Sequence, residues 1–176
     1  GTVETKSVVL SGRPAESIFQ YVKENNIDLM ILSSHGGTGI GRWRYGGVAM
    51  KLLLGAPCST LVVRANEDDK PLGFKRILIP LDGSEEGANA IEPAMNLSKL
   101  LEAETILVNV TSPLLTAAVG TEQADVLAPQ IQSQAEKYLA TVRQKWSSVQ
   151  PNIKIRLEKG PIAHSILKQA QAQDVD

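Results

Sequence analysis

The chain has 176 residues, which is enough for one domain with a hydrophobic core or for parts of two smaller domains. With 43% hydrophobic residues, 21% charged residues and a formal net charge of -1, the composition is that of a soluble globular protein and excludes a general nucleic-acid binder. The single cysteine, Cys58, excludes an intramolecular disulfide framework. No stretch approaches the roughly 20 apolar residues of a membrane helix, and no positive segment followed by an apolar one opens the chain, so we expect a cytoplasmic protein.

Short β-branched runs alternate along the chain with segments whose apolar residues recur at helical spacing, which predicts parallel strands covered by helices. The predicted strands are residues 7–10, 29–33, 60–64, 76–81, 105–110 and 153–157. The predicted helices are residues 15–25, 88–102 with a kink at Pro93, about 130–146, and a last one that starts at Pro161. Residues 111–127 lack an apolar period and are predicted to form a mobile loop.

The most polar break in the chain, residues 65–73, has four charges, a proline and a glycine between two apolar strands, and predicts a linker. Two short segments, which begin near Gly12 and near Gly160, resemble each other and indicate a possible internal repeat. Their offset is 160 minus 12, or 148 residues, a plausible length for a complete α/β domain. If the match is not a chance likeness of two strand-to-helix turns, the chain begins late in one domain and stops partway through the next. The matched residues are Gly12, Ala15, Ser17 and Ile18 with Gly160, Ala163, Ser165 and Ile166.

The stretch from Ser33 to Gly47 holds six glycines and follows an apolar strand. Glycine lets backbone N–H groups approach an anion closely, and a helix that begins at Gly46 or Gly47 would add its positive end. Val48, Leu52 and Leu53 are expected to face the core from that helix. The geometry suits phosphate, although neither GxxxxGK[ST] nor a complete GxGxxG is present.

Three side chains in this stretch have two interpretations each. Arg42 and Arg44 alternate with aromatic residues and would supply cationic donors, or are simply solvated. His35 would donate a hydrogen bond to phosphate, or is structural.

A second polar turn follows the strand at residues 76–81. Asp82 is placed to bind a ribose or a base edge at the carboxyl end of the sheet, where open α/β folds bind ligands. Ser84 fits the N-cap of the next helix, with Gly87 where a capping box would have glutamate. Capping by Ser84 and ligand contact by Asp82 are compatible.

The remaining residues form no hydrolytic or metal-binding pattern. His35 and His164 lie in unlike contexts, and Cys58 has no evident base nearby in the sequence. We therefore expect binding and not catalysis.

Five segments together resemble the universal stress protein family: FKRILIPLDGS, ILVNV, DLMILSSHG, GGV and APCSTLVV. The resemblance covers nearly the whole chain and implies a Rossmann-like α/β fold with an open parallel sheet of strand order 3-2-1-4-5, covered by helices on both faces. It also implies ATP or AMP as ligand, with or without Mg²⁺, and a homodimer through the final strand, here from Ser59 to Arg64.

The family's nucleotide-binding loop, G-x2-G-x9-G-[ST], aligns here as Ser33-x2-Gly36-x9-Gly46-Gly47. Serine replaces the first glycine, and Gly47 replaces the last hydroxyl residue. The resemblance makes the loop residues phosphate neighbours and assigns Asp82 to the ribose and Val110 to the adenine. The nucleotide-binding residues implied are Asp82, Val110, Ser33, His35, Gly36, Gly46, Gly47 and Val48.

The family's closing elements come first in this chain and its opening elements second. Residues 1–64 are predicted to be the C-terminal part of a first domain, 65–74 a linker, and 75–176 the N-terminal part of a second. Either the two parts belong to separate domains, or they combine within one chain or by exchange between two chains. The expected function is adenine-nucleotide binding in stress response, and the alternative is a nucleotide-free structural or dimerising module of the same fold.

Overall fold

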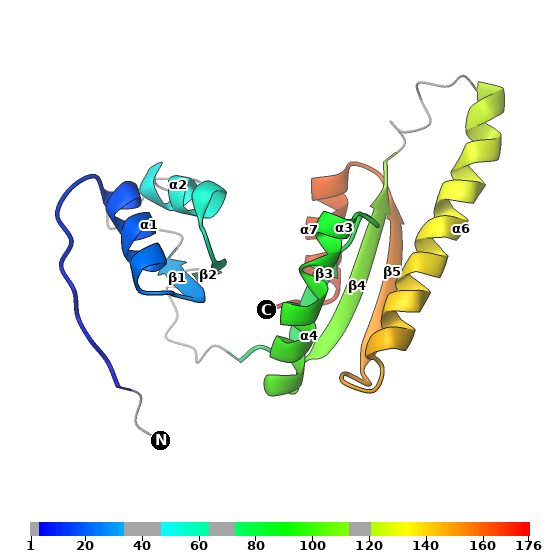
Figure 1. Cartoon of the computed structure of the whole chain (residues 1–176). Coiled ribbons are helices and arrows are strands. Elements are labelled where there is room, and N and C mark those ends of the chain that lie inside the picture. The colour runs from blue at the N-terminus through cyan, green and yellow to red at the C-terminus, as the bar shows by residue number, and fades with distance from the viewer. Residues whose placement is uncertain (1–3, 34–46, 64–72, 113–120) are drawn as a thin grey trace. The chain divides into compact units, whose positions relative to one another are not determined.

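The computed structural model describes residues 4–33, 47–63, 73–112 and 121–176, and it divides the chain into two compact units, Gly1–Pro71 and Leu72–Asp176 (Figure 1). The candidate residues His35, Gly36, Arg42, Arg44 and Gly46 lie outside the described residues.

In the first unit, two parallel strands carry two helices. Their order along the chain is α1 (Pro14–Glu24), β1 (Leu29–Ser33), α2 (Gly47–Gly55) and β2 (Ser59–Val63). The register places Leu29 opposite Ser59 and Ser33 opposite Val63. A small core forms where the apolar sides of both helices meet β1; its buried members are Ala15, Met30 and Leu52, with Ile18, Phe19, Leu32, Ala56 and Cys58 packed against them.

The second unit contains a three-stranded parallel sheet in the order β3-β4-β5. Its elements are β3 (Arg76–Pro80), α3 (Glu85–Ala88), α4 (Ile91–Leu100), β4 (Glu104–Thr111), α6 (Thr121–Trp146), β5 (Ile153–Lys159) and α7 (Ile162–Ala172). The central strand β4 is apolar on successive residues because both of its faces are covered.

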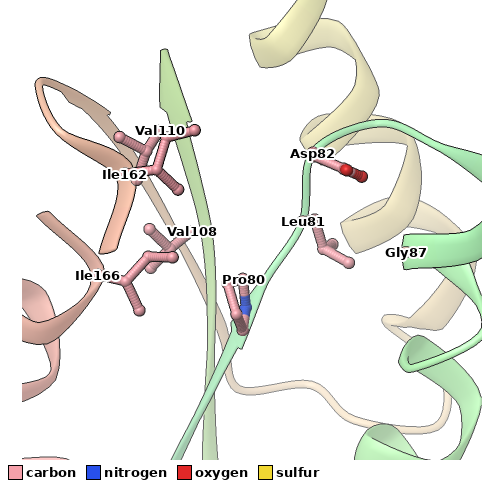
Figure 2. A pocket seen from close by; sticks show the side chains of 8 residues that line it. All are labelled: Pro80, Leu81, Asp82, Gly87, Val108, Val110, Ile162 and Ile166. Carbon is pink, nitrogen blue, oxygen red and sulfur yellow. The ribbon is translucent and has the colours of Figure 1, made fainter. Parts of the chain in front are cut away.

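The main core of this unit lies between the sheet and the helices α4 and α6. Met95 from α4, Leu107 from β4 and Leu139 from α6 meet there with no exposed surface. Helix α7 contacts β4 and β5 and carries Ile162 and Ile166 toward the opposite face, the side of Val108 and Val110 (Figure 2). The sheet is therefore covered on both faces.

These observations confirm an α/β fold with parallel strands and covering helices. The five strands in the described ranges are divided between two sheets, and each sheet matches a consecutive part of the expected order: β5-β4-β3 corresponds to 3-2-1, and β1-β2 to 4-5. The assignment of the units to parts of successive domains stays a prediction.

Two of the predicted elements are wrong. Residues 7–10 form no strand, because a strand exists only as part of a hydrogen-bonded ladder and no described strand pairs with them. The loop predicted at 111–127 is wrong for residues 121–127, which form the start of α6. In the first turns of α6, Asp125 and Val126 are exposed. This part of the helix therefore has no apolar period in the sequence.

The helices differ from the predictions in two further details. The helix predicted for residues 88–102 is shorter and corresponds to α4, since Ala88 belongs to the preceding helix α3. Pro93 lies in the first turn of α4, where its missing N–H costs no helical hydrogen bond. Leu52 is buried and Leu53 partly buried, as expected, but Val48 is 42% exposed, because it lies in the first turn of α2 away from the core of this unit.

The turns that precede α1 and α7 have the same local structure. Gly12 has φ +124° and Gly160 φ +145°, conformations that favour glycine. A Cβ at Gly12 would lie 2.8 Å from Ser17 Oγ, and one at Gly160 would lie 2.9 Å from Ser165 Oγ. The glycine and the serine of each pair therefore fit together in the same way.

The helices and the turns after them also correspond. Helices α1 and α7 both have 11 residues and start 148 positions apart, at 14 and 162. Asn26 and Asp174, which are equivalent at that offset, both have φ 50°. The backbone hydrogen bonds Ile27 N–H to Val22 O (3.0 Å) and Val175 N–H to Ala170 O (2.9 Å) are equivalent too.

Candidate functional site

A pocket of about 250 Å³ opens in the second unit, at the carboxyl ends of β3 and β4 (Figure 2). Its walls are apolar side chains from β3, β4 and α7, and the carboxylate of Asp82 lies at its rim. The lining residues are Pro80, Leu81, Asp82, Gly87, Val108, Val110, Ile162 and Ile166. Figure 2 shows Val108 and Val110 facing Ile162 and Ile166, while Leu81 and Asp82 lie on the side of α3.

Asp82 is held by hydrogen bonds from a residue two positions later. Its Oδ1 accepts from the backbone N–H of Ser84 at 2.9 Å and from the Ser84 hydroxyl at 2.6 Å. These bonds favour the ionised carboxylate, and they hold the pKa of Asp82 below its ordinary value of 3.8. Asp82 is exposed and is therefore a fixed negative charge at the pocket rim at neutral pH.

Ser84 caps α3, as predicted: its hydroxyl oxygen accepts from Gly87 N–H at 2.9 Å. A Cβ at Gly87 would lie 2.6 Å from Asp82 Oδ1. The position that would hold glutamate in a capping box is therefore glycine because the Asp82 carboxylate needs the space.

We predict that Ser84→Ala raises the pKa of Asp82 toward 3.8, because both the hydroxyl bond and the ordered turn stabilise the carboxylate. The loss of the cap should cost about 1 kcal/mol of folding stability. Because the folded-state pKa is lowered, the stabilisation that ionised Asp82 contributes is present above the unfolded-state pKa and is lost as the pH falls through the folded-state value. An NMR titration of the Asp82 side chain measures the shift.

The exposed Ser148, in the turn after α6, supplies the control variant Ser148→Ala, which should leave the Asp82 titration unchanged. An Asp82 pKa that stays as low in Ser84→Ala as in the wild type would contradict the assignment of the shift to Ser84.

Asn109 positions the segment that carries Asp82, a role that sequence reasoning missed. It is 94% buried, and its Nδ2 donates to Leu81 O at 2.8 Å. The signal in the sequence was one polar residue inside the apolar strand ILVNV.

Asn109 Oδ1 and the hydroxyl of Tyr138 are buried without a hydrogen-bond partner among the described residues. Burial, and secondarily the charge of Asp82, raise the pKa of Tyr138.

The expected site residues fall in both units. Asp82 and Val110 line the same pocket in the second unit. In the first unit, Ser33 ends β1 and Gly47 begins α2, next to the exposed Val48. Ile162 and Ile166, which lie on the helix predicted to start at Pro161, form one wall of the pocket and were not among the expected site residues.

Parallel strands, covering helices and a pocket at the carboxyl ends of β3 and β4 define an open α/β protein whose pocket lies at the edge of the sheet where such folds bind ligands. The model of the Universal stress protein family matches residues 1–64 and 73–176. The chain belongs to this family.

Individual relatives agree with this assignment. A curated universal stress protein of Thermus aquaticus, encoded in the QAH/OAS sulfhydrylase 3' region, is 33% identical over 64 residues, which are 36% of this chain and 47% of that protein. The matched stretch thus spans about half the length of that relative.

Two solved structures share the fold. A universal stress protein family member from Burkholderia pseudomallei is 17% identical, with a TM-score of 0.52 over 60% of this chain and 80% of that one. PA1789 from Pseudomonas aeruginosa PAO1, described as functionally unknown, is 17% identical, with a TM-score of 0.67 over 94% of this chain and 56% of that one.

Two features are absent from the described part of the chain. Within it, no group of three or more His, Cys, Asp or Glu side chains is arranged to hold a metal ion. None of the helices described is both long and apolar enough to cross a membrane.

Proposed function

We propose that this member of the universal stress protein family acts in stress response by binding an adenine nucleotide, ATP or AMP, without turning it over. The observation that carries the proposal is the apolar pocket with one fixed carboxylate at its rim. Apolar walls suit a flat base, and a carboxylate suits the paired hydroxyl groups of a ribose. The pocket volume of about 250 Å³ is below the roughly 300–1,000 Å³ of complete ligand pockets, so it suits the nucleoside part of the ligand and leaves the phosphates outside.

The proposed roles of the residues follow from apolar contact with the base and hydrogen bonding to the ribose. Val110 contacts the adenine and Asp82 accepts hydrogen bonds from the ribose, while the triphosphate, with or without Mg²⁺, is bound by residues at the carboxyl end of β1 and the start of α2. The proposed phosphate neighbours are Ser33, His35, Gly36, Gly46, Gly47 and Val48.

Isothermal titration calorimetry of the full chain with ATP, AMP and adenosine, with and without Mg²⁺, tests the proposal. Asp82→Ala should weaken binding of all three ligands by about 10- to 100-fold, because a hydrogen bond to a charged group contributes roughly 1.5–3 kcal/mol. Asp125→Ala, which removes an exposed carboxylate from α6, should bind like the wild type. Absence of heat at millimolar ligand would refute nucleotide binding.

The departures at Ser33 and Gly47 favour a second candidate, a nucleotide-free structural or dimerising module of the same fold. Serine adds a Cβ where a backbone would approach phosphate, and Gly47 removes a hydroxyl donor. This candidate predicts no binding of ATP or AMP, together with self-association that does not depend on nucleotide.

A further inference from the structure

Strand β4 carries a polar side chain on the face of the sheet that packs against α4 and α6. Side chains of a strand alternate between its two faces, so Asn109 lies on the same face as Leu107, which belongs to the main core. The Asn109 carboxamide is buried, and its Nδ2 donates to Leu81 O, directly before Asp82. Its Oδ1 is left as a buried acceptor without a hydrogen-bond partner among the described residues.

Helix α6 brings a second polar atom to this face. Tyr138 packs against the same core, and its hydroxyl group is buried without a hydrogen-bond partner in the described ranges. A buried polar atom that lacks a partner lowers the stability of the folded state. A hydroxyl group can donate a hydrogen bond and an amide oxygen can accept one, so each of the two atoms has the capacity that the other needs.

The two residues lie at similar heights along the sheet. Helix α6 ends near the amino end of β4, because Gln150 N–H donates to Trp146 O at 2.9 Å and Gln150 Nε2 donates to Ala103 O at 2.6 Å. Tyr138 lies eight residues before Trp146 (146 minus 138), a rise of about 12 Å along a helix. The same distance along β4, counted from Ala103, covers about four residues. Helical side chains tilt toward the N-terminus of their helix, which for α6 is the direction of Asn109.

Electrostatics supports this placement of the tyrosine. Burial, and after it the charge of Asp82, raise the pKa of Tyr138. A nearby negative charge disfavours the phenolate in this way. The Tyr138 side chain is therefore close enough to the carboxyl end of β3 to be affected by the carboxylate at the pocket rim.

We infer that Tyr138 is a positioning residue for the pocket, and that one buried water molecule joins its hydroxyl group to Asn109 Oδ1. The two atoms form no direct hydrogen bond, and buried polar atoms of this kind are bridged by ordered water with about two to four partners. The water accepts from the Tyr138 hydroxyl group and donates to Asn109 Oδ1. With its oxygen held, the carboxamide keeps its nitrogen on Leu81 O and so fixes the segment that carries Asp82.

Tyr138 acts on the pocket from the opposite face of the sheet. It belongs to the core between the sheet, α4 and α6, whereas Ile162 and Ile166 of α7 form the pocket wall on the other face. The link between the two faces is the Asn109 carboxamide. Tyr138 therefore orders the carboxylate at the rim without touching a ligand; that the ligand is a nucleotide rests on the proposed function.

A double-mutant cycle without nucleotide tests the link, with urea denaturation of the full chain followed by Trp146 fluorescence in the Trp43→Phe background. Tyr138→Phe should raise the unfolding equilibrium constant about tenfold, because Asn109 Oδ1 and the water lose their donor. In Asn109→Leu, which has no carboxamide, the same substitution should change the constant by less than about twofold. The matched control is Tyr21→Phe on α1, which should leave the unfolding of the second unit unchanged in both backgrounds.

NMR gives a readout that a merely structural role of Tyr138 would not move. The order parameter of the Asn109 side-chain amide should fall from about 0.85, the value of a rigid group, to below about 0.6 in Tyr138→Phe, while the backbone of Leu107 stays rigid. Tyr21→Phe should leave the Asn109 value unchanged. The wild type should also show a nuclear Overhauser cross-peak between a bound water and the Asn109 amide protons.

Three outcomes would overturn the inference. They are an equal cost of Tyr138→Phe in both backgrounds, an Asn109 order parameter that stays high in Tyr138→Phe, and a wild type without a bound water at Asn109. The NMR measurements remain decisive even where Asn109→Leu does not fold. Since no measurement uses a nucleotide, an absence of nucleotide binding would refute the proposed function and leave the role of Tyr138 standing.

Discussion

Val110→Phe is expected to weaken adenine-nucleotide binding by about 100-fold or more. Val110 lines the pocket together with Ile162 and Ile166, so a benzyl group at this position would occupy the volume proposed for the base. Forcing the ring aside would cost roughly 1–3 kcal/mol, and the base would also lose its apolar burial. Fluorescence or calorimetric titration with ATP measures the change.

The control for this variant is Val126→Phe, the same substitution at an exposed position of α6. It should leave the affinity within about twofold of the wild type. Equal affinities of Val110→Phe and the wild type would place the nucleotide elsewhere and would exclude the proposed role of this pocket.

Leu107→Ala is expected to lower the free energy of unfolding of the second unit by about 2–5 kcal/mol. Leu107 has no exposed surface and packs between α4 and α6, so its truncation leaves a cavity that the parallel sheet cannot close. Urea denaturation followed by the fluorescence of Trp146, which packs against this core, measures the change. The substitution Trp43→Phe in every variant restricts the signal to this unit.

Leu100→Ala is the matched control, because this leucine lies in the same unit, on α4, and is 79% exposed. It should change the free energy of unfolding by less than about 0.5 kcal/mol. Similar losses in both variants would show that Leu107 is not part of a well-packed core.

Helices and strands that pack against other elements of their unit could be predicted from the sequence. The predictions were wrong for segments that lack such packing. Strands β3, β4 and β5 were found because their apolar runs are buried by helices on both faces. Residues 7–10 have the same composition but no neighbouring strand, so composition alone predicted a strand that does not form. The first turns of α6 were missed for the opposite reason, since a helix end without a buried face has no apolar period.

The candidate site divides in the same way. Asp82 and Ser84 could be predicted because a strand followed by Asp-Gly-Ser is a local pattern with a local hydrogen-bonding consequence. The contact of Asn109 with Leu81, and the approach of Ile166 to Val108, join residues far apart in the sequence, and no periodicity encodes them. The reason for glycine at position 87 also required the three-dimensional position of the Asp82 carboxylate.

Different forces stabilise the three-stranded sheet at the amino ends of its strands and at their carboxyl ends. At the amino end, Glu104 binds Lys154 at 2.6 Å and lies 3.8 Å from Arg76, which in turn binds Asp174, so one chain of charges crosses all three strands and reaches the segment after α7. At the carboxyl end, around the pocket, the contacts are apolar packing and hydrogen bonds, such as the one from Asn109 Nδ2 to Leu81 O. Ionic strength therefore acts on one end of the sheet only: added salt screens the charges that hold Asp174 against β3 and leaves the pocket walls unchanged.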